Sequence, residues 1–356
     1  MEMKVNIPNN PYNIIIQRGI FDTALNEVKK VFKGNKIFIV TDENVDKFYG
    51  ERILNNLKDE NIHLKKMILK PGEETKSIKN LELIYKEMAL FNISRSDLLI
   101  ALGGGVIGDI SGFAASTFLR GIPFIQIPTT ILAQVDSSIG GKVAVNLDSG
   151  KNLVGSFYQP KLVLIDPNFL KTLPIRNVND GLSEVIKHGC IKDLDLFNKL
   201  SSFKDYDELF TGIENIIYTN CDIKRKVVEK DERDIGERMV LNFGHTIGHG
   251  IERYFNYEKY THGEAVAIGM YKITKISEDM GLTKLGTKEK IKEVLLKYSL
   301  PTECEIDDKE RLMESILLDK KSSSKNINLI FLKDIGDSFM HNIKKEDLSK
   351  IIKRMW

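Results

Sequence analysis

The sequence predicts an α/β fold in its N-terminal half, a doubly wound parallel sheet, followed by a mostly α-helical half. Strand-like apolar segments alternate with helix-like segments up to about residue 170, which is typical of a parallel sheet covered by helices. From about Pro174 onward, long segments of helical periodicity replace this alternation. Residues 98–135 hold only two charged residues, Asp109 and Arg120, which indicates strands and a helix that are buried on both faces.

The expected strands are short apolar runs bounded by turn residues. They lie in the cores of YNIIIQRG, KIFIVTD, HLKKMILKPG, DLLIALGGG, IPFIQIPTT and KLVLIDP. Helices are expected in FDTALNEVKKVF and IKNLELIYKEMAL, and later in VNDGLSEVIKHGCI, GIENIIYTNCDIKRKVVEK, RMVLNFGHTIGHGIERYF and HGEAVAIGMYKITKISEDM. Pro174 stands in a short link, and a chain of 356 residues is long enough for two domains. We therefore predict domains at residues 1–173 and 174–356.

Charge and cysteine content narrow the class of protein. The formal net charge is +2, so no nucleic-acid or membrane partner is expected, although a small anionic ligand needs only a local cluster of cations. The three cysteines, Cys190, Cys221 and Cys304, have no CxxC spacing and fit a reducing compartment. The N-terminus lacks a signal-peptide pattern and no apolar run reaches membrane-spanning length, so we expect a cytoplasmic protein.

A glycine-rich turn, GGGVIGD at residues 103–109, follows an apolar strand and opens an apolar helix. Glycines let the backbone approach a phosphate, and the start of a helix offers N–H donors to it. The standard dinucleotide fingerprint fails, because Thr129 and Thr130 stand where an acid would follow about twenty residues later. Asp42, which ends an earlier strand, can accept ribose hydroxyls instead. The turn therefore predicts phosphate or dinucleotide binding, with a purely structural turn as the alternative.

Three of the six histidines fall within eighteen residues. His245 and His249 stand at i and i+4, so they share one helix face, and His262 begins the next helical segment. Imidazoles with one carboxylate are the ligands of a catalytic zinc site that keeps an open position. Glu184, in a helical segment that also carries Lys187, is the natural carboxylate. The spacing leaves open whether His245 or His249 is the ligand.

Cationic and polar residues accompany these motifs. Residues 128–152 are predicted to form a loop-rich segment, in which Lys142 follows two glycines. Lys224 and Arg238 precede the histidine pair, and Arg238 shares a helix face with Asn242 if that helix begins early enough. Arginine can bind a carboxylate through two donors and lysine suits a phosphate. Each cation alone is explained as a solvated surface residue, but as a set they indicate an anionic substrate.

These motifs together resemble the 3-dehydroquinate synthase family of sugar-phosphate cyclases. The agreement runs from Asp42 to Lys321 through PGEETKS, GGGVIGDISGFAAS, FLRGIPFIQIPTTILAQVDSSIGGK, GKNLVGSFYQP, GLSEVIKHG, LNFGHTIGHGIE and HGEAVAIGM. The resemblance implies a dehydroquinate synthase-like fold: a Rossmann-like NAD-binding domain and an α-helical metal- and substrate-binding domain, with the site between them. It also implies a homodimer.

The family's activity is the second step of the shikimate pathway to chorismate and aromatic amino acids. The resemblance therefore implies conversion of 3-deoxy-D-arabino-heptulosonate 7-phosphate to 3-dehydroquinate and phosphate, with NAD and a divalent metal, zinc or cobalt. Transient oxidation of the C5 hydroxyl acidifies the neighbouring C–H so that phosphate can leave. The hydride then returns, the ring opens and an intramolecular aldol step closes the carbocycle. Either a side chain or the leaving phosphate can abstract the proton.

The resemblance also assigns roles to individual residues. The metal ligands are Glu184, His245 and His262, which makes His249 a neighbour of the substrate. The cofactor-binding positions are Asp42, Asn44, Gly72, Glu73, Lys76, Gly104, Gly105, Val106, Gly108, Asp109, Thr129, Thr130, Lys142, Lys151 and Thr172. The catalytic positions are Asp136, Lys142, Lys187, Lys224, Arg238, Asn242 and His249. The substrate-binding positions are Arg120, which would reach the neighbouring subunit, Asn152, and Lys321 or its neighbour Lys320.

Two positions depart from the family pattern: Asn177 stands where LPxRE has Glu, and Val143 replaces a common Thr. Three alternative functions remain open. Another sugar-phosphate cyclase, such as 2-deoxy-scyllo-inosose or valiolone synthase, would use a substrate without the carboxylate that Lys224 and Arg238 are expected to face. A polyol dehydrogenase of the glycerol dehydrogenase type would accumulate NADH. A binding module without chemistry would retain only the fold.

Overall fold

The computed structural model describes residues 1–318 and 326–355, and they form two compact units. One unit consists of Met1–Pro174 and Ile213–Arg233, and the other of Ile175–Gly212 and the chain from Asp234 on. The sequence-based boundary placed residues 213–233 in the second domain, whereas the structure packs them with the first unit. All but the last three of these residues belong to the long helix α7 (Tyr206–Lys230), whose periodicity indicates a buried face but not which unit covers it.

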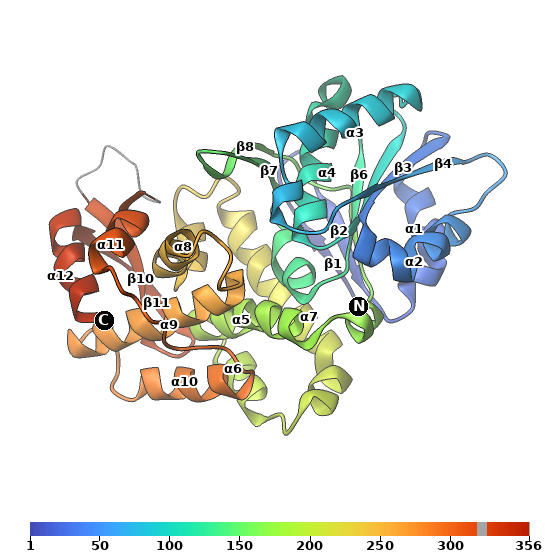
Figure 1. The fold of residues 1–356 in the computed structure, drawn as a ribbon. Coiled ribbons are helices and arrows are strands. Elements are labelled where there is room, and N and C mark those ends of the chain that lie inside the picture. Colours follow the sequence, from blue (N-terminus) through green and yellow to red (C-terminus); the bar gives the residue numbers. More distant parts are fainter. Residues whose placement is uncertain (319–325, 356) are drawn as a thin grey trace. The chain divides into compact units, whose positions relative to one another are not determined.

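A seven-stranded sheet forms the centre of the first unit (Figure 1). Its strands are β1 (Glu2–Val5), β2 (Tyr12–Ile16), β3 (Lys36–Asp42), β4 (His63–Leu69), β5 (Leu98–Gly103), β6 (Phe124–Pro128) and β9 (Leu162–Ile165). They lie in the order β1-β2-β9-β6-β5-β3-β4, and every neighbouring pair is parallel except β1 and β2. The predicted parallel sheet is confirmed. Only β1, a short strand with alternate residues exposed, was not predicted.

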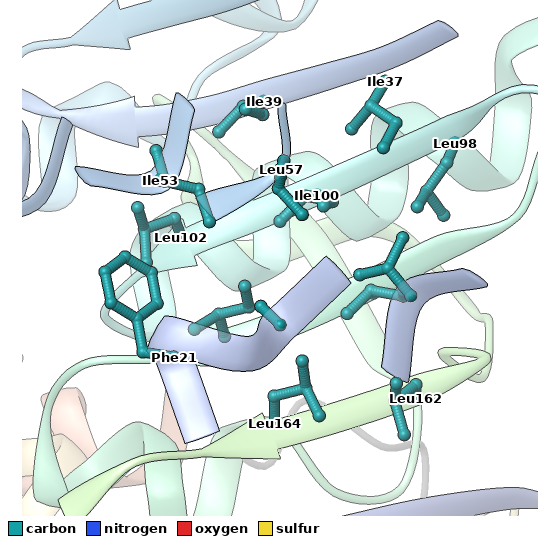
Figure 2. Packing of buried hydrophobic residues seen from close by; sticks show 14 of the residues in the cluster. Phe21, Ile37, Ile39, Ile53, Leu57, Leu98, Ile100, Leu102, Leu162 and Leu164 are labelled. Atoms are coloured by element: carbon teal, nitrogen blue, oxygen red, sulfur yellow. The ribbon is translucent and has the colours of Figure 1, made fainter. Parts of the chain in front are cut away.

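Helices cover both faces of this sheet. Helices α1 (Ala24–Val31) and α2 (Glu43–Asn56) pack on one face, and α3 (Ile78–Leu90) and α4 (Gly105–Thr117) on the other. On the first face Phe21, Ile53 and Leu57 pack against strand residues such as Ile39 and Ile100, as Figure 2 shows. Full burial of such a side chain stabilises a fold by about 1.5–3 kcal/mol. Cores on both faces explain why residues 98–135 hold so few charges.

The chain changes its direction across the sheet at β3. It passes from β3 through α2 to β4 at the edge, and then returns through α3 to β5 on the other side of β3. From β5 it continues through α4 to β6. The connections that leave β3 and β5 therefore lie on opposite faces, which makes the carboxyl ends of these two strands a topological switch point. Open α/β sheets bind their ligands at such points.

Residues 128–152 were predicted as a loop-rich segment, and the structure corrects this. A π-helical turn, η4 (Ala133–Ser137), is followed by the antiparallel pair β7 (Lys142–Leu147) and β8 (Gly150–Phe157). Val143 and Val145 are buried where β7 packs on α4, and their neighbours Lys142, Ala144 and Asn146 are more exposed. The surrounding glycines, lysines and asparagines conceal this short alternation in the sequence.

The second unit is mostly α-helical, as predicted. Its helices are α5 (Ile175–Lys192), α6 (Leu194–Ser202), α8 (His245–Tyr254), α9 (His262–Asp279), α10 (Thr287–Lys297), α11 (Lys309–Leu318) and α12 (Lys345–Met355). It also contains an antiparallel hairpin of β10 (Asn326–Asp334) and β11 (Asp337–Lys344), which was not predicted. No helix within residues 1–318 and 326–355 is both long and apolar enough to cross a membrane.

Short helical turns complete the chain. They are η1 (Ile20–Thr23), η2 (Glu73–Thr75), η3 (Phe118–Arg120), η5 (Pro167–Thr172) and η6 (Glu237–Asn242). The helix predicted through Arg238 and His249 is broken, because η6 is a 3₁₀ turn and Gly244 has a left-handed φ of 78°. Arg238 and Asn242 therefore do not share an α-helical face, since a 3₁₀ helix repeats every three residues. A Cβ atom on Gly244 would lie 2.6 Å from Cγ of Met270, so only glycine fits at this break.

Candidate active site

Three helices of the second unit bring together Glu184, His245 and His262. Glu184 is fully buried in α5, while His245 and His262 are the first residues of α8 and α9. Nε2 of His245 lies 3.5 Å from Oε1 of Glu184, and Nε2 of His262 lies 3.6 Å from the same oxygen. One ligand atom from each residue can be chosen so that all lie within 4.8 Å of one another. This donor set suits a divalent metal ion that keeps coordination positions open for a substrate.

Glycines on α8 and α9 allow the two histidines to approach each other. A Cβ atom on Gly269 would lie only 2.1 Å from the carbonyl oxygen of Gly244. A Cβ atom on Gly248 would lie 3.1 Å from the carbonyl oxygen of Ala265. The backbones of the two helices are therefore in close contact at the ends that carry the imidazoles.

Polar contacts hold α5 against the start of α9. Oδ1 of Asp180 accepts a hydrogen bond from the backbone N–H of Gly263 at 2.6 Å. Arg176 donates to both oxygens of Glu264 at 2.8 Å, and Glu264 in turn completes a capping box with Thr261. Because Gly263 and Glu264 directly follow His262, these contacts fix the backbone from which its ring projects.

The second nitrogen of each imidazole also faces an acceptor. Nδ1 of His245 lies 3.1 Å from the carbonyl oxygen of Phe243, and Nδ1 of His262 lies 3.6 Å from Oε2 of Glu252. An acceptor at Nδ1 favours the proton there and leaves Nε2 for a metal ion. The sequence interpretation missed Glu252. The signal was its spacing, since His245, His249 and Glu252 stand at i, i+4 and i+7 of one helix face.

Charges around the three candidate ligands set their protonation. Burial raises the pKa of Glu184, but the ion pair with Lys187 and the two imidazoles outweigh it and hold the pKa well below its usual value. Burial, reinforced by Lys187, lowers the pKa of His245 well below its usual value. Burial also lowers the pKa of His262, but Glu184 and Glu252 overcome this and raise it well above its usual value. The site therefore favours a positive charge at His262, which a proton or a metal cation can supply.

His249 lies beside this group. Its ring centroid is 5.3 Å from that of His245 and 6.0 Å from that of His262. A second group of potential ligands, His249, Glu252 and His262, overlaps the first at His262. The group with Glu184 fits a metal better, because Oε1 of Glu184 is buried and accepts no hydrogen bond from any residue that the structure describes.

The glycine-rich turn lies at the carboxyl end of β5, beside that of β3. Oδ1 of Asp42 caps α2 by accepting hydrogen bonds from the backbone of Asn44 and Val45 at 2.9 and 3.1 Å. A Cβ atom on Gly104 would lie 3.2 Å from Cγ2 of Thr130, and one on Gly105 would lie 3.0 Å from Oγ of Ser137. The switch point thus brings four predicted cofactor positions, namely Asp42, Gly104, Gly105 and Thr130, to neighbouring strand ends.

Two other predicted cofactor residues pair with each other. Nζ of Lys76 lies 2.5 Å from Oδ2 of Asp109, and Lys76 is only 5% exposed. Burial raises the pKa of Asp109, and Lys76 partly offsets that effect. Oε1 of Glu73 accepts a hydrogen bond from Nδ2 of Asn146 at 2.8 Å, which ties the turn at Gly72 to β7.

Predicted substrate residues occur in both units. In the first unit, Nζ of Lys224 lies 2.6 Å from Oδ1 of Asp136. Lys142 and Asn152 lie on the hairpin of β7 and β8, where Asn152 has a left-handed φ of 57°. In the second unit Arg238 is buried within η6.

The remaining predicted positions lie in short helical turns, at the start of α5 or outside the described residues. Arg120 is exposed in η3 with a φ of 67°. Thr172 lies in η5 and contacts Tyr49. Asn177, which departs from the family pattern, is exposed in the first turn of α5. Lys320 and Lys321 lie outside the described residues.

Comparison with protein families decides which family these features represent. The model described as "3-dehydroquinate synthase N-terminal" matches residues 66–180, and "3-dehydroquinate synthase C-terminal" matches residues 181–322. The chain belongs to the 3-dehydroquinate synthase family. A 3-dehydroquinate synthase of Clostridium botulinum is 56% identical over 97% of this chain and 99% of its own length. Another, from Clostridium acetobutylicum, is 54% identical over 99% of both chains.

Solved structures carry the same fold as this member of the 3-dehydroquinate synthase family. A 2-deoxy-scyllo-inosose synthase, in complex with carbaglucose-6-phosphate, NAD+ and Co2+, aligns with a TM-score of 0.88 and 24% identity over 99% of this chain and all of its own. The 2-epi-5-epi-valiolone synthase of Streptomyces hygroscopicus, with NAD+ and Zn2+ bound, aligns with a TM-score of 0.87 and 24% identity over 98% of both chains. At this identity the likeness establishes the fold alone.

Proposed function

We propose that this chain catalyses the conversion of 3-deoxy-D-arabino-heptulosonate 7-phosphate to 3-dehydroquinate and phosphate. The observation that carries the proposal is the convergence of Glu184, His245 and His262 in a chain whose relatives are named 3-dehydroquinate synthase over nearly their whole length. The reaction needs a metal ion, a hydride acceptor and cations for a carboxylate and a phosphate. The residues of this chain fit each of these requirements.

We assign zinc or cobalt to Glu184, His245 and His262. The buried Oε1 of Glu184 has no hydrogen bond from the described residues, and the lowered pKa of His245 keeps its imidazole in the neutral form that binds a metal ion. Enzymes of the same fold are described with Co2+ and with Zn2+. A bound divalent ion supplies Lewis-acid polarisation of the hydroxyl and carbonyl oxygens of the substrate. Lys187, ion-paired with Glu184, keeps that carboxylate ionised for the metal.

We assign NAD to the switch point at the ends of β3 and β5. Asp42 is held by its capping hydrogen bonds and suits the ribose hydroxyls, while Gly104, Gly105 and the start of α4 suit the pyrophosphate. Bound NAD supplies a reversible hydride acceptor. The assigned cofactor set is completed by Asn44, Gly72, Glu73, Lys76, Val106, Gly108, Asp109, Thr129, Thr130, Lys142, Lys151 and Thr172.

The substrate has a carboxylate at one end and a phosphate at the other. We assign Arg238, Asn242 and Lys224 to the carboxylate, because a guanidinium binds it through two donors. Asp136 holds the ammonium group of Lys224 in place for this contact. His249 lies beside the metal ligands and is assigned to the substrate, where it can exchange a proton. Lys142, Asn152 and, outside the described residues, Lys320 or Lys321 are assigned to the phosphate end.

A homodimer in the cytoplasm is the assembly we propose. Leu119 and Arg120 both adopt left-handed φ angles, 52° and 67°, which cost non-glycine residues about 1–3 kcal/mol each. This strain supports a role for the exposed Arg120 in reaching a second copy of the chain. No disulfide joins Cys190, Cys221 or Cys304 among the residues that the structure describes, which supports a reducing compartment.

The test is turnover of the heptulosonate phosphate by the purified protein, followed by phosphate release with and without a chelator. We expect phosphate release that the chelator abolishes and that added Zn2+ or Co2+ restores, with no NADH accumulating at steady state. Turnover only of glucose 6-phosphate or sedoheptulose 7-phosphate would replace this function by that of another cyclase. Steady accumulation of NADH would indicate a polyol dehydrogenase instead.

A further inference from the structure

Glu252 is a buried carboxylate that the proposed reaction does not use. It is 5% exposed and lies on α8, the helix that begins with His245. Its Oε2 atom lies 3.6 Å from Nδ1 of His262. A buried carboxylate is stabilised by nearby positive charge or hydrogen bonds, and the imidazole of His262 is one group placed to supply them.

We propose that Glu252 is a positioning residue that orients His262 and strengthens metal binding, an inference that rests on the proposed function. The two nitrogens of His262 face different carboxylates: Nε2 faces Glu184 and Nδ1 faces Glu252. A carboxylate at Nδ1 holds the proton on that nitrogen and turns the lone pair of Nε2 toward Glu184 and His245. Histidine ligands of metal ions are commonly oriented in this way by a residue that does not touch the metal.

The balance of charge gives a second argument for Glu252. Glu184 is the only carboxylate in the group of Glu184, His245 and His262, and it is already ion-paired with Lys187. Lys187 is 1% exposed, so water screens its charge poorly. A divalent cation bound there would be repelled by Lys187. Glu252 provides a negative charge on the far side of His262 that offsets this repulsion.

Glu252 also belongs to the overlapping group with His249 and His262, where it would touch the metal itself. The geometry favours the positioning role, because Glu252 contacts His262 from the Nδ1 side, whereas Nε2 of His262 lies 3.6 Å from Oε1 of Glu184. The two roles predict different spectra when Co2+ occupies the site. Loss of a metal ligand changes the visible d–d bands of Co2+. Loss of a residue that contacts only a ligand leaves the set of coordinating atoms, and therefore these bands, unchanged.

The experiment compares the full-length parent chain with Glu252→Gln, Glu252→Asp and the surface control Glu293→Gln. Glu293 is exposed on α10, so Glu293→Gln removes the same charge as Glu252→Gln but at a surface position. For each metal-free protein the dissociation constant for Co2+ is measured by competition with a chromophoric chelator. The visible spectrum is recorded at saturation, and the melting temperature of the metal-free form monitors folding.

We expect Glu252→Gln to weaken Co2+ binding by about 10–100-fold, with the bands of the saturated site unchanged. Glu252→Asp, which keeps the charge on a shorter arm, should recover part of the loss, and Glu293→Gln should match the parent. Unchanged affinity in Glu252→Gln would overturn the inference, and so would altered Co2+ bands, which would make Glu252 a ligand. A parent chain that binds no Co2+ would instead overturn the metal assignment of the proposed function.

Discussion

At the scale of single residues, substitution of His245 and of His249 shows which of the two imidazoles is the metal ligand. Both lie on one face of α8, but Nε2 of His245 is the atom that lies 3.5 Å from Glu184. We expect His245→Ala to weaken Co2+ binding by more than about 100-fold, beyond the effect of losing an outer contact. We expect His249→Ala to keep close to the parent's affinity while phosphate release slows. Competition titration of both variants measures this, and the reverse order of affinities would make His249 the ligand.

The Asp97 carboxylate makes a pH-dependent contribution to the free energy of unfolding. Its carboxylate accepts hydrogen bonds from the backbone of Asn35 at 3.1 Å, of Lys36 at 3.0 Å and of Ser94 at 2.7 Å, which joins the starts of β3 and β5. Burial raises the pKa of Asp97, but a hydrogen bond from Oγ of Ser94 at 2.7 Å and these backbone bonds outweigh it and hold the pKa below its usual value. The stabilisation is thus complete above the unfolded-state pKa of about 3.9 and is lost as pH falls through the lower folded-state value.

We therefore expect Asp97→Asn to lower the free energy of unfolding by about 1.5–3 kcal/mol near neutral pH, because hydrogen bonds to a charged group are lost. The difference from the parent should shrink as the pH falls below about 4. Chemical denaturation at several pH values measures it, with exposed Asp148→Asn as the control. A difference that grows on acidification would contradict the assignment.

At the scale of elements, the contact between α8 and α9 decides whether the metal ligands meet. A Cβ atom on Gly269 would lie 2.1 Å from the backbone of Gly244, so Gly269→Ala must push the two helices apart. We expect a loss of about 1–3 kcal/mol in stability together with weaker Co2+ binding. Gly212→Ala in α7 is the control, because its Cβ would lie at an ordinary 3.4 Å from Phe203. Chemical unfolding and Co2+ titration of both variants measure these effects. Parent-like Co2+ affinity in Gly269→Ala would contradict the importance of this helix contact for the metal site.

Elements with a complete periodic pattern were predictable, and those with a short or mixed pattern were not. All six apolar runs became strands of the sheet because burial on both faces leaves continuous apolar sequence. The pair β7 and β8 was missed since only one face of β7 is buried and β8 contains Gly150 and Gly155. The break at Gly244 depends on Met270 and Val266 of another helix, which no local pattern can report.

At the scale of the whole molecule, cofactor and metal functions are assigned to different units. The glycine-rich turn belongs to the first unit and the three metal ligands to the second. We expect Gly105→Val to lose NAD binding, because its side chain would press on Ser137, while Co2+ affinity stays unchanged. NAD at about 100 times its dissociation constant should stabilise the parent by about 2.7 kcal/mol and leave this variant unshifted. Thermal shift and metal titration report the two functions separately, and joint loss of both would contradict this division.

The sequence by itself determined the fold class, the family and the chemical types of the site residues. Continuous apolar runs, a glycine-rich turn and clustered histidines are local patterns, which can be recognised in the sequence without knowledge of the fold. Only the tertiary structure decided that Glu252 lies beside Nδ1 of His262, that Gly244 breaks the helix predicted through His249, and that residues 213–233 pack with the first unit. The physical reason is that periodicity reports which face of an element is buried, whereas the partner that buries it is set by packing between segments far apart in the chain.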